Sequence, residues 1–392
     1  MNQVNDITFN RIKTLTELHG APNFEAPVRH FLKEQMSPYV DAFVYDRMGG
    51  IYGVKKSKKA NAPRVMIAAH MDEIGFMVTE VTQEGFIKFT ALGGVANDIW
   101  QGQRLKIRTS TDEEIIGVVA NIPKHFRTGQ EGAPKIDDLL LDIGAENKQE
   151  VFQREIAIGD PIVPHTELIQ LSEHRFAGKA WDNRYGCVIA LEILEALNDI
   201  DLEVDLYVGA NVQEEVGLRG AEAATHLIQP DLAFVVDCSP ANDMKGQSGL
   251  SGQLGQGALL RIKDGTMLLK PNFKAFLMDL ATQHHIKYQY YISPGGTDGG
   301  VIHKSLTGVP TAVIGVCARY IHSTDAVFDI RDYHQAKQWL LHAIRSLNEK
   351  QIQQLQYEQQ RRIYNEIHSK CRGVSKFNSI QISFYVYRRM VS

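Results

Sequence analysis

The sequence predicts an α/β fold: a doubly wound, mostly parallel sheet covered by helices, with a small all-β domain inserted into it. After about residue 178, strand-like apolar segments alternate with helix-like segments, which is typical of a parallel sheet covered on both faces. Between about 75 and 170 the chain instead consists of short β-rich segments separated by Gly, Asp and Pro, with no long amphipathic helix. That pattern of short β-rich segments indicates a separate β-module.

The elements follow in order along the chain. Helical spacing runs from 8 to 36, and the apolar run PRVMIAAH predicts a buried strand from 63 to 70. The alternating part then predicts a helix in RYGCVIALEILEALN, a strand in VDLYVGAN, a helix near 217–227, a strand in LAFVVD, a helix around 272–285, strands in YQYYIS and VPTAVIGV, and a helix from 331 to 348. The N-terminal segment also ends in a buried strand, so it most simply joins the same sheet.

These elements divide the chain into three parts. Residues 1–74 and 170–349 form one α/β domain, and residues 75–169 form a barrel-like β-domain inserted into it. Residues 350–392 are an atypical C-terminal tail, in which QISFYVYRRMVS is a short aromatic run without an obvious partner. Nothing in the tail suggests chemistry.

Composition excludes several classes of protein. The 392 residues carry a formal net charge of −4, which argues against a nucleic-acid partner, because binding a phosphate backbone needs a basic face. No apolar run approaches the roughly 18 residues of a membrane span, so we expect no membrane partner. The four cysteines form no CxxC pair and fit reduced thiols in a cytoplasmic protein.

Candidate metal ligands lie at the ends of the predicted strands. Ligands of an open α/β sheet bind beyond the carboxyl ends of its strands. The sequence places imidazole and carboxylate side chains at such ends or in the turns beside them, namely His70, Asp72, Asp182, Glu214, Glu215, Asp237 and His322. Imidazole and carboxylate together suit zinc, cobalt or manganese, so we expect a metal site at this edge of the sheet.

Each of these residues also has an ordinary structural explanation. His70 alone fits a hydrogen-bonded core or surface group, and Asp182 or Asp237 alone fits a helix N-cap. The adjacent Glu214 and Glu215 are harder to explain in this way, because two like charges side by side at a strand end need solvent or a cation. The metal hypothesis therefore depends on the whole set.

Five motifs taken together identify a family. HMDEIGFMV, GKAWDNRYG, QEEVGLRGA, VVDCSPA and RYIHSTDA resemble, in order and spacing, the tetrahedral and glutamyl aminopeptidases, a family of dinuclear metallopeptidases. The resemblance covers roughly residues 5 to 350. It implies a metallopeptidase-like catalytic domain, a β-domain that mediates dimerisation, and homodimers that build a hollow dodecamer.

The resemblance also implies roles for single residues. It assigns two divalent ions per subunit, Zn²⁺ or Co²⁺ with Mn²⁺ as an alternative, to five ligands: Asp182 bridges both ions, His70 and Asp237 complete one site, and Glu215 and His322 complete the other. Asp72 would orient His70, a role expected of a carboxylate beside a metal-bound imidazole. Glu214 would be the general base, taking a proton from the activated water and passing it to the leaving amine of a peptide substrate.

Substrate preference depends on smaller features. WDNRYG and CARYIHS are most similar to the glutamyl branch of the family, which removes N-terminal Glu and Asp. An acidic side chain needs a cation, and Arg319 is the nearest candidate, although it could equally pair with a local carboxylate. The loop SPGGTDGG lacks the Lys-Ser/Thr of a nucleotide-binding loop. In the resembled family it borders the active site, so Thr297 and Asp298 are substrate-binding candidates; the alternative is a tight turn that caps a helix.

Three other functions compete with this interpretation. A cellulase-like glycosidase needs two carboxyl groups about 5 Å or more apart and no metal, which leaves the histidines unexplained. A metal-stabilised scaffold would close its site with four ligands and would not need a spare base such as Glu214. An acylamino-acid deacylase or dipeptide hydrolase would use similar ligands, and whether the substrate needs a free α-amine would distinguish such an enzyme from an aminopeptidase. Within the aminopeptidases, a broad or leucyl-type specificity is the alternative to the acidic one.

Overall fold

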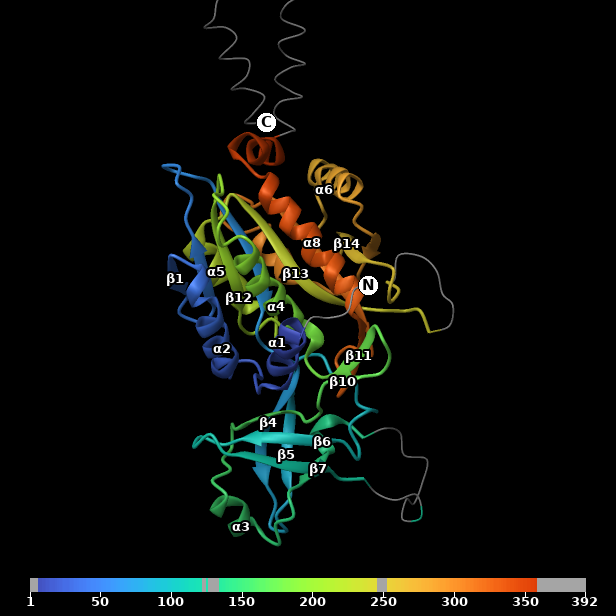
Figure 1. Cartoon of the computed structure of the whole chain (residues 1–392). Coiled ribbons are helices and arrows are strands. Elements are labelled where there is room, and N and C mark those ends of the chain that lie inside the picture. Colours follow the sequence, from blue (N-terminus) through green and yellow to red (C-terminus); the bar gives the residue numbers. More distant parts are fainter. Residues whose placement is uncertain (1–5, 122–124, 126–133, 245–251, 358–392) are drawn as a thin grey trace, which may run out of the picture.

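The computed structural model describes residues 6–121, 125, 134–244 and 252–357. They form two parts, a large sheet covered by helices and a small closed barrel of six strands (Figure 1). The chain enters the barrel directly after the third strand of the sheet and returns to the sheet before α4. The predicted combination of an α/β domain with an inserted all-β domain is therefore confirmed.

The centre of the large sheet is parallel. Its four neighbouring strands are β12 (Asp205–Asn211), β3 (Arg64–His70), β13 (Leu232–Pro240) and β16 (Thr311–Arg319), in that order. These strands are almost continuously buried, since helices cover both faces of the sheet. All four strands run in one direction, so their carboxyl ends meet at one edge.

Antiparallel strands flank this centre. On one side lie β2 (Ile51–Lys55) and β1 (Ala42–Tyr45), and on the other lie β17 (Ala326–Asp329), β11 (Arg175–Gly178) and β10 (Ile169–Gln170). β14 (Ala258–Lys263) pairs antiparallel with β16 and parallel with β15 (Tyr288–Ile292). Several of these strands have only two to four residues, too few for a periodic pattern in the sequence to reveal them.

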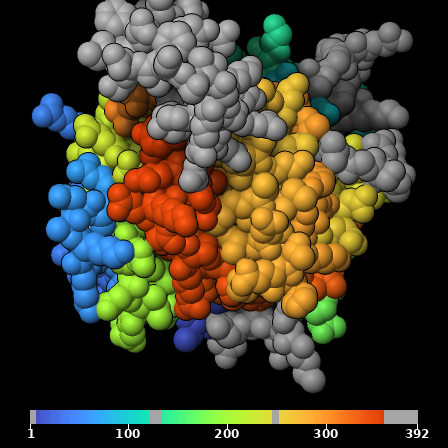
Figure 2. All heavy atoms as spheres, turned by 90° about the horizontal axis from the view of Figure 1, so that it is seen from above, coloured from blue at the N-terminus to red at the C-terminus, as the bar shows by residue number. Residues whose placement is uncertain are grey.

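Helices pack on both faces. The larger buried cluster lies under α1 (Asp6–Glu17), α2 (Ala26–Met36), α4 (Trp181–Ala196), α6 (Pro271–Gln283) and α8 (Ile330–Ser346). The opposite face packs against α5 (Arg219–Ile228) and α7 (Asp298–Ile302). Figure 2 shows α6 and α8 side by side, where the indole of Trp339 donates to the carbonyl of Leu277 at 2.9 Å. The stretch predicted as helical from 8 to 36 divides into α1 and α2.

The barrel has its own core. Its strands are β4 (Gly75–Val81), β5 (Ile87–Leu92), β8 (Leu140–Asp142), β7 (Glu114–Val119), β6 (Arg104–Arg108) and β9 (Pro161–Pro164), paired in that order. Phe76 packs edge-on against Phe89 and Trp100, with ring centroids 5.0 and 4.8 Å apart. A short helix, α3 (Lys148–Gln153), lies between β8 and β9. The aromatic residues belong to a cluster of buried side chains that is distinct from the core of the large sheet.

The C-terminal end of the described chain continues past α8. Residues 349–357 are helical, and Ile352 and Leu355 are buried in the core of the large sheet. The first residues of the predicted tail are thus part of the α/β domain, while residues 358–392, including the aromatic run, lie outside the described residues. None of the described helices is both long enough and apolar enough to span a membrane.

We expect the buried His19 to make the stability of this fold sensitive to acid. It lies between α1 and α2 with 2% of its surface exposed, and burial together with the charge of Lys179 lowers its pKa to about 3. The unfolded chain takes up a proton near the ordinary pKa of about 6.5, whereas the folded chain does not, so the free energy of unfolding falls as the pH drops below that value.

We therefore expect His19→Leu to reduce the pH dependence of stability. Urea unfolding between pH 7 and 5 checks this. Below pH 6.5 the wild type is expected to lose up to about 1.4 kcal/mol per pH unit more than the variant. Parallel curves for the two proteins would contradict the assignment.

Candidate metal centre

The predicted ligands meet at the carboxyl edge of the parallel strands. His70 is the last residue of β3 and pairs in register with Asn211, the last residue of β12. Asp237 lies within β13, and Glu214 and Glu215 follow β12 by a few residues. Since parallel strands end at the same edge, residues far apart in the sequence converge here.

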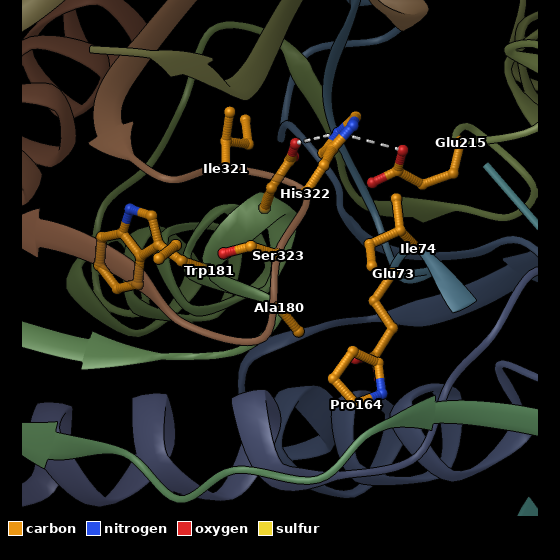
Figure 3. A pocket seen from close by; sticks show the side chains of 11 residues that line it. Glu73, Ile74, Pro164, Ala180, Trp181, Glu215, Ile321, His322 and Ser323 are labelled. Atoms are coloured by element: carbon orange, nitrogen blue, oxygen red, sulfur yellow. Dashed lines mark ion pairs between the residues drawn. The ribbon is translucent and has the colours of Figure 1, made fainter. Parts of the chain in front are cut away.

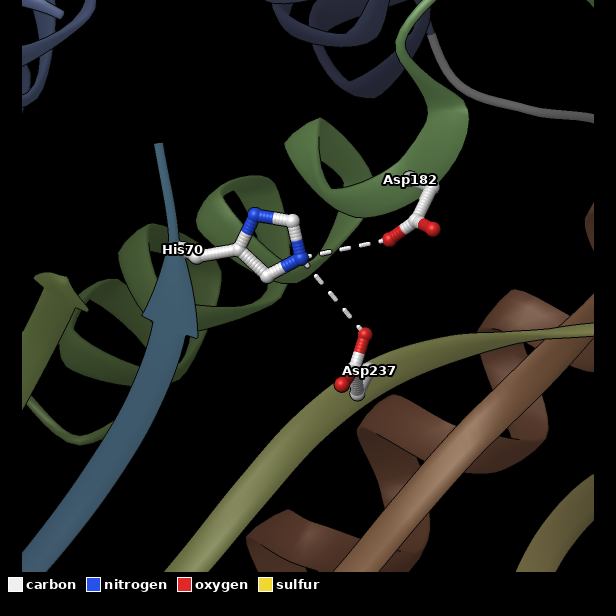
Figure 4. A group of neighbouring side chains, drawn as sticks. All are labelled: His70, Asp182 and Asp237. Carbon is white, nitrogen blue, oxygen red and sulfur yellow. Dashed lines mark ion pairs between the residues drawn. The ribbon is translucent and has the colours of Figure 1, made fainter. Parts of the chain in front are cut away.

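The first group consists of His70, Asp182 and Asp237 (Figure 4). His70 Nε2 lies 3.2 Å from Asp182 Oδ1 and 3.7 Å from Asp237 Oδ1. One donor atom from each residue lies within 4.8 Å of the other two. The group is almost fully enclosed: the side chains of His70 and Asp237 are 2% and 5% exposed.

The second group consists of Asp182, Glu215 and His322. Figure 3 labels Glu215 and His322 of this group. His322 Nε2 lies 3.3 Å from both Asp182 Oδ2 and Glu215 Oε2. Asp182 is therefore common to both groups, and its two oxygens face different histidines. That arrangement is suited to bridging two cations.

Both histidines present Nε2 to the carboxylates. The Nδ1 atom of His70 is bonded to the carbonyl of Asp72 at 3.1 Å, and Nδ1 of His322 is bonded to the carbonyl of Gly94 at 2.7 Å. A carbonyl only accepts, so Nδ1 carries the proton in each ring and the neutral ring has its lone pair on Nε2. Metal-binding histidines are commonly oriented in this way.

An irregular backbone places Asp182. Ala180 has φ of 51°, in the left-handed region, and Asp182 has non-helical ψ of 106° although it lies at the start of α4. The Asn183 side chain donates to the carbonyl of Val236 at 2.7 Å, which joins this segment to β13 beside Asp237. Asp182 is thus displaced from a regular helix toward the strand ends, and α4 has no side-chain hydrogen bond at its N-cap.

A glycine lets β16 approach Asp237 closely. Gly315 pairs with Asp237, and a Cβ atom at Gly315 would lie 2.1 Å from the Asp237 carbonyl oxygen. Any larger residue there would push the strand that carries Asp237 away. The Gly in VPTAVIGV therefore contributes to the position of a candidate ligand.

Asp72 positions the two glutamates. Its fully buried carboxylate accepts the backbone N–H of Glu214 at 3.0 Å through Oδ1 and that of Glu215 at 2.9 Å through Oδ2. The same Oδ1 lies 3.6 Å from His70 Nδ1. The direct bond to the His70 ring comes from the Asp72 backbone, so the carboxylate mainly holds the Glu214–Glu215 segment.

The crowded carboxylates change the pKa values of the site. Burial, with the charge of Asp182, raises the pKa of Glu215 to about 8, and burial raises that of Glu214 well above its usual range. Although burial opposes it, Asp182 and Glu215 raise the pKa of His322 to about 9. Such a group of acids retains protons unless another cation replaces them.

Unsatisfied oxygens fit a site for metal ions. Asp182 Oδ1, Glu215 Oε1 and Asp298 Oδ1 are buried and make no hydrogen bond to any described residue. Buried carboxylate oxygens normally have partners, because burying them alone is costly. Two of the three belong to the groups above, and oxygen with imidazole nitrogen is a donor set that suits Zn²⁺, Co²⁺ or Mn²⁺. The residues present therefore fit a pair of divalent ions.

A narrow pocket opens beside the second group (Figure 3). Its lining mixes polar and apolar residues and comes from both parts of the chain: Glu73, Ile74, Pro164, Ala180, Trp181, Asp182, Glu215, Ile321, His322, Ser323 and Ala326. Pro164 belongs to barrel strand β9, so the barrel contributes to the surroundings of the site.

The three predicted substrate-binding residues have different surroundings. Arg319 makes a bidentate pair with Asp243, with Nε–Oδ1 at 2.6 Å and Nη2–Oδ2 at 2.9 Å. It therefore pairs with a local carboxylate, the alternative to binding an acidic substrate. Thr297 caps α7 by accepting the N–H of Gly299. Asp298 lies next to the centre: it accepts from the Asn211 amide at 2.8 Å, and burial raises its pKa to about 7.

Some residues of the site were not singled out from the sequence. Asn211, which links Asp298 to the hydroxyl of Tyr52, and Asp243 belong to this set. So does the buried trio of Glu73, Lys179 and Arg184. A sequence signal existed for this trio, because its members lie inside the motifs HMDEIGFMV and GKAWDNRYG.

Comparisons with known proteins agree with this geometry. Residues 49–339 match the family model of the M42 glutamyl aminopeptidases. The chain is 43% identical to a glutamyl aminopeptidase of Lactococcus lactis, over 88% of this chain and 98% of that protein. It is 30% identical to a lysyl aminopeptidase of Pyrococcus furiosus, over 83% of this chain and 93% of that protein.

Solved structures show the same architecture. A TET aminopeptidase from a marine sediment Thaumarchaeota archaeon superposes with a TM-score of 0.85 at 32% identity, covering 89% of this chain and 99% of that one. PhTET1-12s, solved as a dodecamer, gives a TM-score of 0.78 at 25% identity, covering 86% of this chain and 99% of that one. The chain therefore belongs to the M42 glutamyl aminopeptidase family and is an aminopeptidase.

Proposed function

We propose that this protein is a dinuclear metalloaminopeptidase that releases N-terminal residues from peptides, with a preference for Glu and Asp. The observation that carries the metal part of the proposal is the shared Asp182, whose two oxygens face His70 and His322. His70 and Asp237 would complete one site, and Glu215 and His322 the other. Zn²⁺ and Co²⁺ are the expected ions, with Mn²⁺ as an alternative.

Two divalent ions at such a centre supply a more acidic water and a polarised scissile carbonyl. We propose Glu214 as the general base. Two observations support this role: its Oε2 lies 3.9 Å from His70 Nε2, and its backbone N–H donates to Asp72. Burial raises the pKa of the Glu214 carboxyl, which lets it take a proton and return it to the leaving amine. Adjacent glutamates divide the work, with Glu215 as a ligand and Glu214 as the proton carrier.

The acidic preference is supported by sequence similarity. The relative at 43% identity is a glutamyl aminopeptidase, whereas the lysyl aminopeptidase is only 30% identical. Arg319 remains the candidate cation, but Asp243 already occupies its Nε and Nη2. A substrate carboxylate would have to bind its remaining N–H groups, which favours a graded preference over an exclusive one.

The barrel is proposed as a dimerisation domain, spanning residues 75–169 between the catalytic segments 1–74 and 170–349. Ile116 and Val118 of β7 are 48% and 46% exposed on its outer face, and a partner subunit would cover such side chains. PhTET1-12s forms a dodecamer, and we propose the same assembly for this chain, in the cytoplasm.

A panel of substrates tests the function. We expect hydrolysis of glutamyl- and aspartyl-p-nitroanilide to exceed that of leucyl-p-nitroanilide, to stop after chelation and to return with zinc, cobalt or manganese. Preferential hydrolysis of leucyl substrate would keep the mechanism and reject the acidic preference. Equal cleavage of an N-acetylated substrate would favour an acylamino-acid deacylase, and activity that survives chelation would reject the metal centre.

Glu214→Gln tests the general base. It removes the proton acceptor and keeps the shape, so kcat is expected to fall by about 10²–10⁴-fold while metal content is unchanged. Glu215→Gln is the matched comparison, because it is expected to lower metal content as well. A Glu214→Gln enzyme with kcat near wild type would show that another group moves the proton.

Asp72→Asn tests the support of the two glutamates. The amide can accept only one of the two N–H groups that the carboxylate accepts, so the activity is expected to fall by roughly 10–100-fold in a folded protein. Asp46→Asn is the control for the same change away from the centre: Asp46 accepts the N–H groups of Met48, Gly49 and Gly50 in the β1–β2 turn through Oδ1, and the Asn oxygen can keep these bonds. Equal losses in both variants would contradict a specific role for Asp72.

A further inference from the structure

A buried carboxylate joins the two segments that carry candidate ligands. Glu73, Lys179 and Arg184 are 1%, 2% and 0% exposed and form what we call the Glu73 cluster. Lys179 Nζ donates to Glu73 Oε1 and Oε2 at 2.7 and 2.6 Å, and Arg184 Nη2 donates to Oε1 at 3.1 Å. One negative charge thus lies between two positive charges in the interior.

The position of the cluster in the chain connects it to the centre. Glu73 lies three residues after His70, in the turn that follows β3. Lys179 lies three residues before Asp182, and Arg184 lies two residues after it. Lys179 and Arg184, which flank Asp182 in the sequence, therefore both bind Glu73, which follows His70.

The Asp182 segment needs contacts from outside to hold its shape. A regular helical turn would position its residues through backbone hydrogen bonds, but the segment is non-helical at Asp182 and Asn183 and left-handed at Ala180. Such conformations persist only where surrounding structure fixes them. The Glu73 cluster provides contacts at both ends of the segment.

The cluster is also fixed to the rest of the domain. Arg184 donates to the carbonyls of Leu15, Leu18 and Met71, and Lys179 donates to that of Leu18. The backbone N–H of Glu73 donates to the carbonyl of Gly20 at 3.0 Å. The end of α1, the turn after β3 and the start of α4 are thereby held together. Glu73 is also one of the residues that line the pocket (Figure 3).

We propose that Glu73 is a positioning residue of the metal centre, which sets the separation of Asp182 from His70 by binding Lys179 and Arg184. This inference rests on the metal centre of the proposed function. Glu73 itself provides no metal ligand; it acts through the two segments. Replacing Glu73 is expected to change the affinity and coordination geometry of bound metal ions, in addition to any loss of stability.

Glu73→Gln tests the proposal, because the amide keeps the shape but leaves two buried cations without a counter-charge. Glu192→Gln is the matched control. Glu192 is also a buried carboxylate, 6% exposed, and binds Lys337 Nζ at 2.5 Å and the Tyr333 hydroxyl at 2.7 Å, but it lies in the middle of α4, away from both groups. Both variants are expected to unfold at lower temperature than the wild type.

The decisive measurement is Co²⁺ binding to the full-length apoprotein, followed by the visible absorption of bound Co²⁺, which reports coordination geometry. Glu73→Gln is expected to weaken Co²⁺ binding by about 10–100-fold and to change the spectrum, whereas Glu192→Gln leaves both as in the wild type. Lys179→Gln, which keeps the pair of Glu73 with Arg184, is expected to weaken binding too, and it replaces Glu73→Gln if that variant does not fold.

Three outcomes would overturn the proposal. If the folded variants of Glu73 and Lys179 bind Co²⁺ with wild-type affinity and spectrum, the cluster does not position the ligands. If Glu192→Gln weakens binding equally, the effect is general destabilisation. If the wild type itself binds no Co²⁺, the metal centre of the proposed function fails and the positioning role fails with it.

Discussion

The arrangement of this protein depends on one electrostatic constraint: buried carboxylates concentrated at one edge of a sheet need positive charge. Asp72, Asp182, Glu215, Asp237 and Asp298 are all largely enclosed there. Two histidines face them through Nε2, and three carboxylate oxygens make no hydrogen bond within the described part of the chain. Divalent cations satisfy this constraint with the donor atoms already in place, whereas protons satisfy it only by neutralising the acids.

The surrounding fold also keeps these mutually repelling groups at short distances from one another. Parallel strands bring His70 and Asp237 to the same edge, and the close approach allowed by Gly315 sets the position of Asp237. Hydrogen bonds from backbone N–H groups to Asp72 fix the two glutamates. Ala180 and His322 have left-handed backbone conformations, which residues other than Gly rarely adopt. The contacts of the site therefore fix a backbone geometry that these residues would not prefer on their own.

The barrel is more than an appended module. The carbonyl of Gly94, which follows β5, binds Nδ1 of His322, and Pro164 of β9 lines the pocket. Residues of the inserted segment therefore orient a candidate ligand and shape the space beside it. A shift of the barrel, for example when subunits assemble, would therefore act directly on the orientation of His322 and on the shape of the pocket.

The sequence by itself determined the fold class, the family and the set of candidate ligands. Long apolar strands and amphipathic helices have periodic patterns, and ligands at strand ends follow from the geometry of parallel sheets, so β3, β12, β13 and β16 and the residues at their ends could be predicted. Only the tertiary structure decided which side chains face one another. It paired Arg319 with Asp243, directed the Asp72 carboxylate to the backbone of Glu214 and Glu215, and joined Glu73 to Lys179 and Arg184. The physical reason is that these contacts join segments distant in sequence, and their partners depend on side-chain direction and burial, which no local pattern of residues encodes.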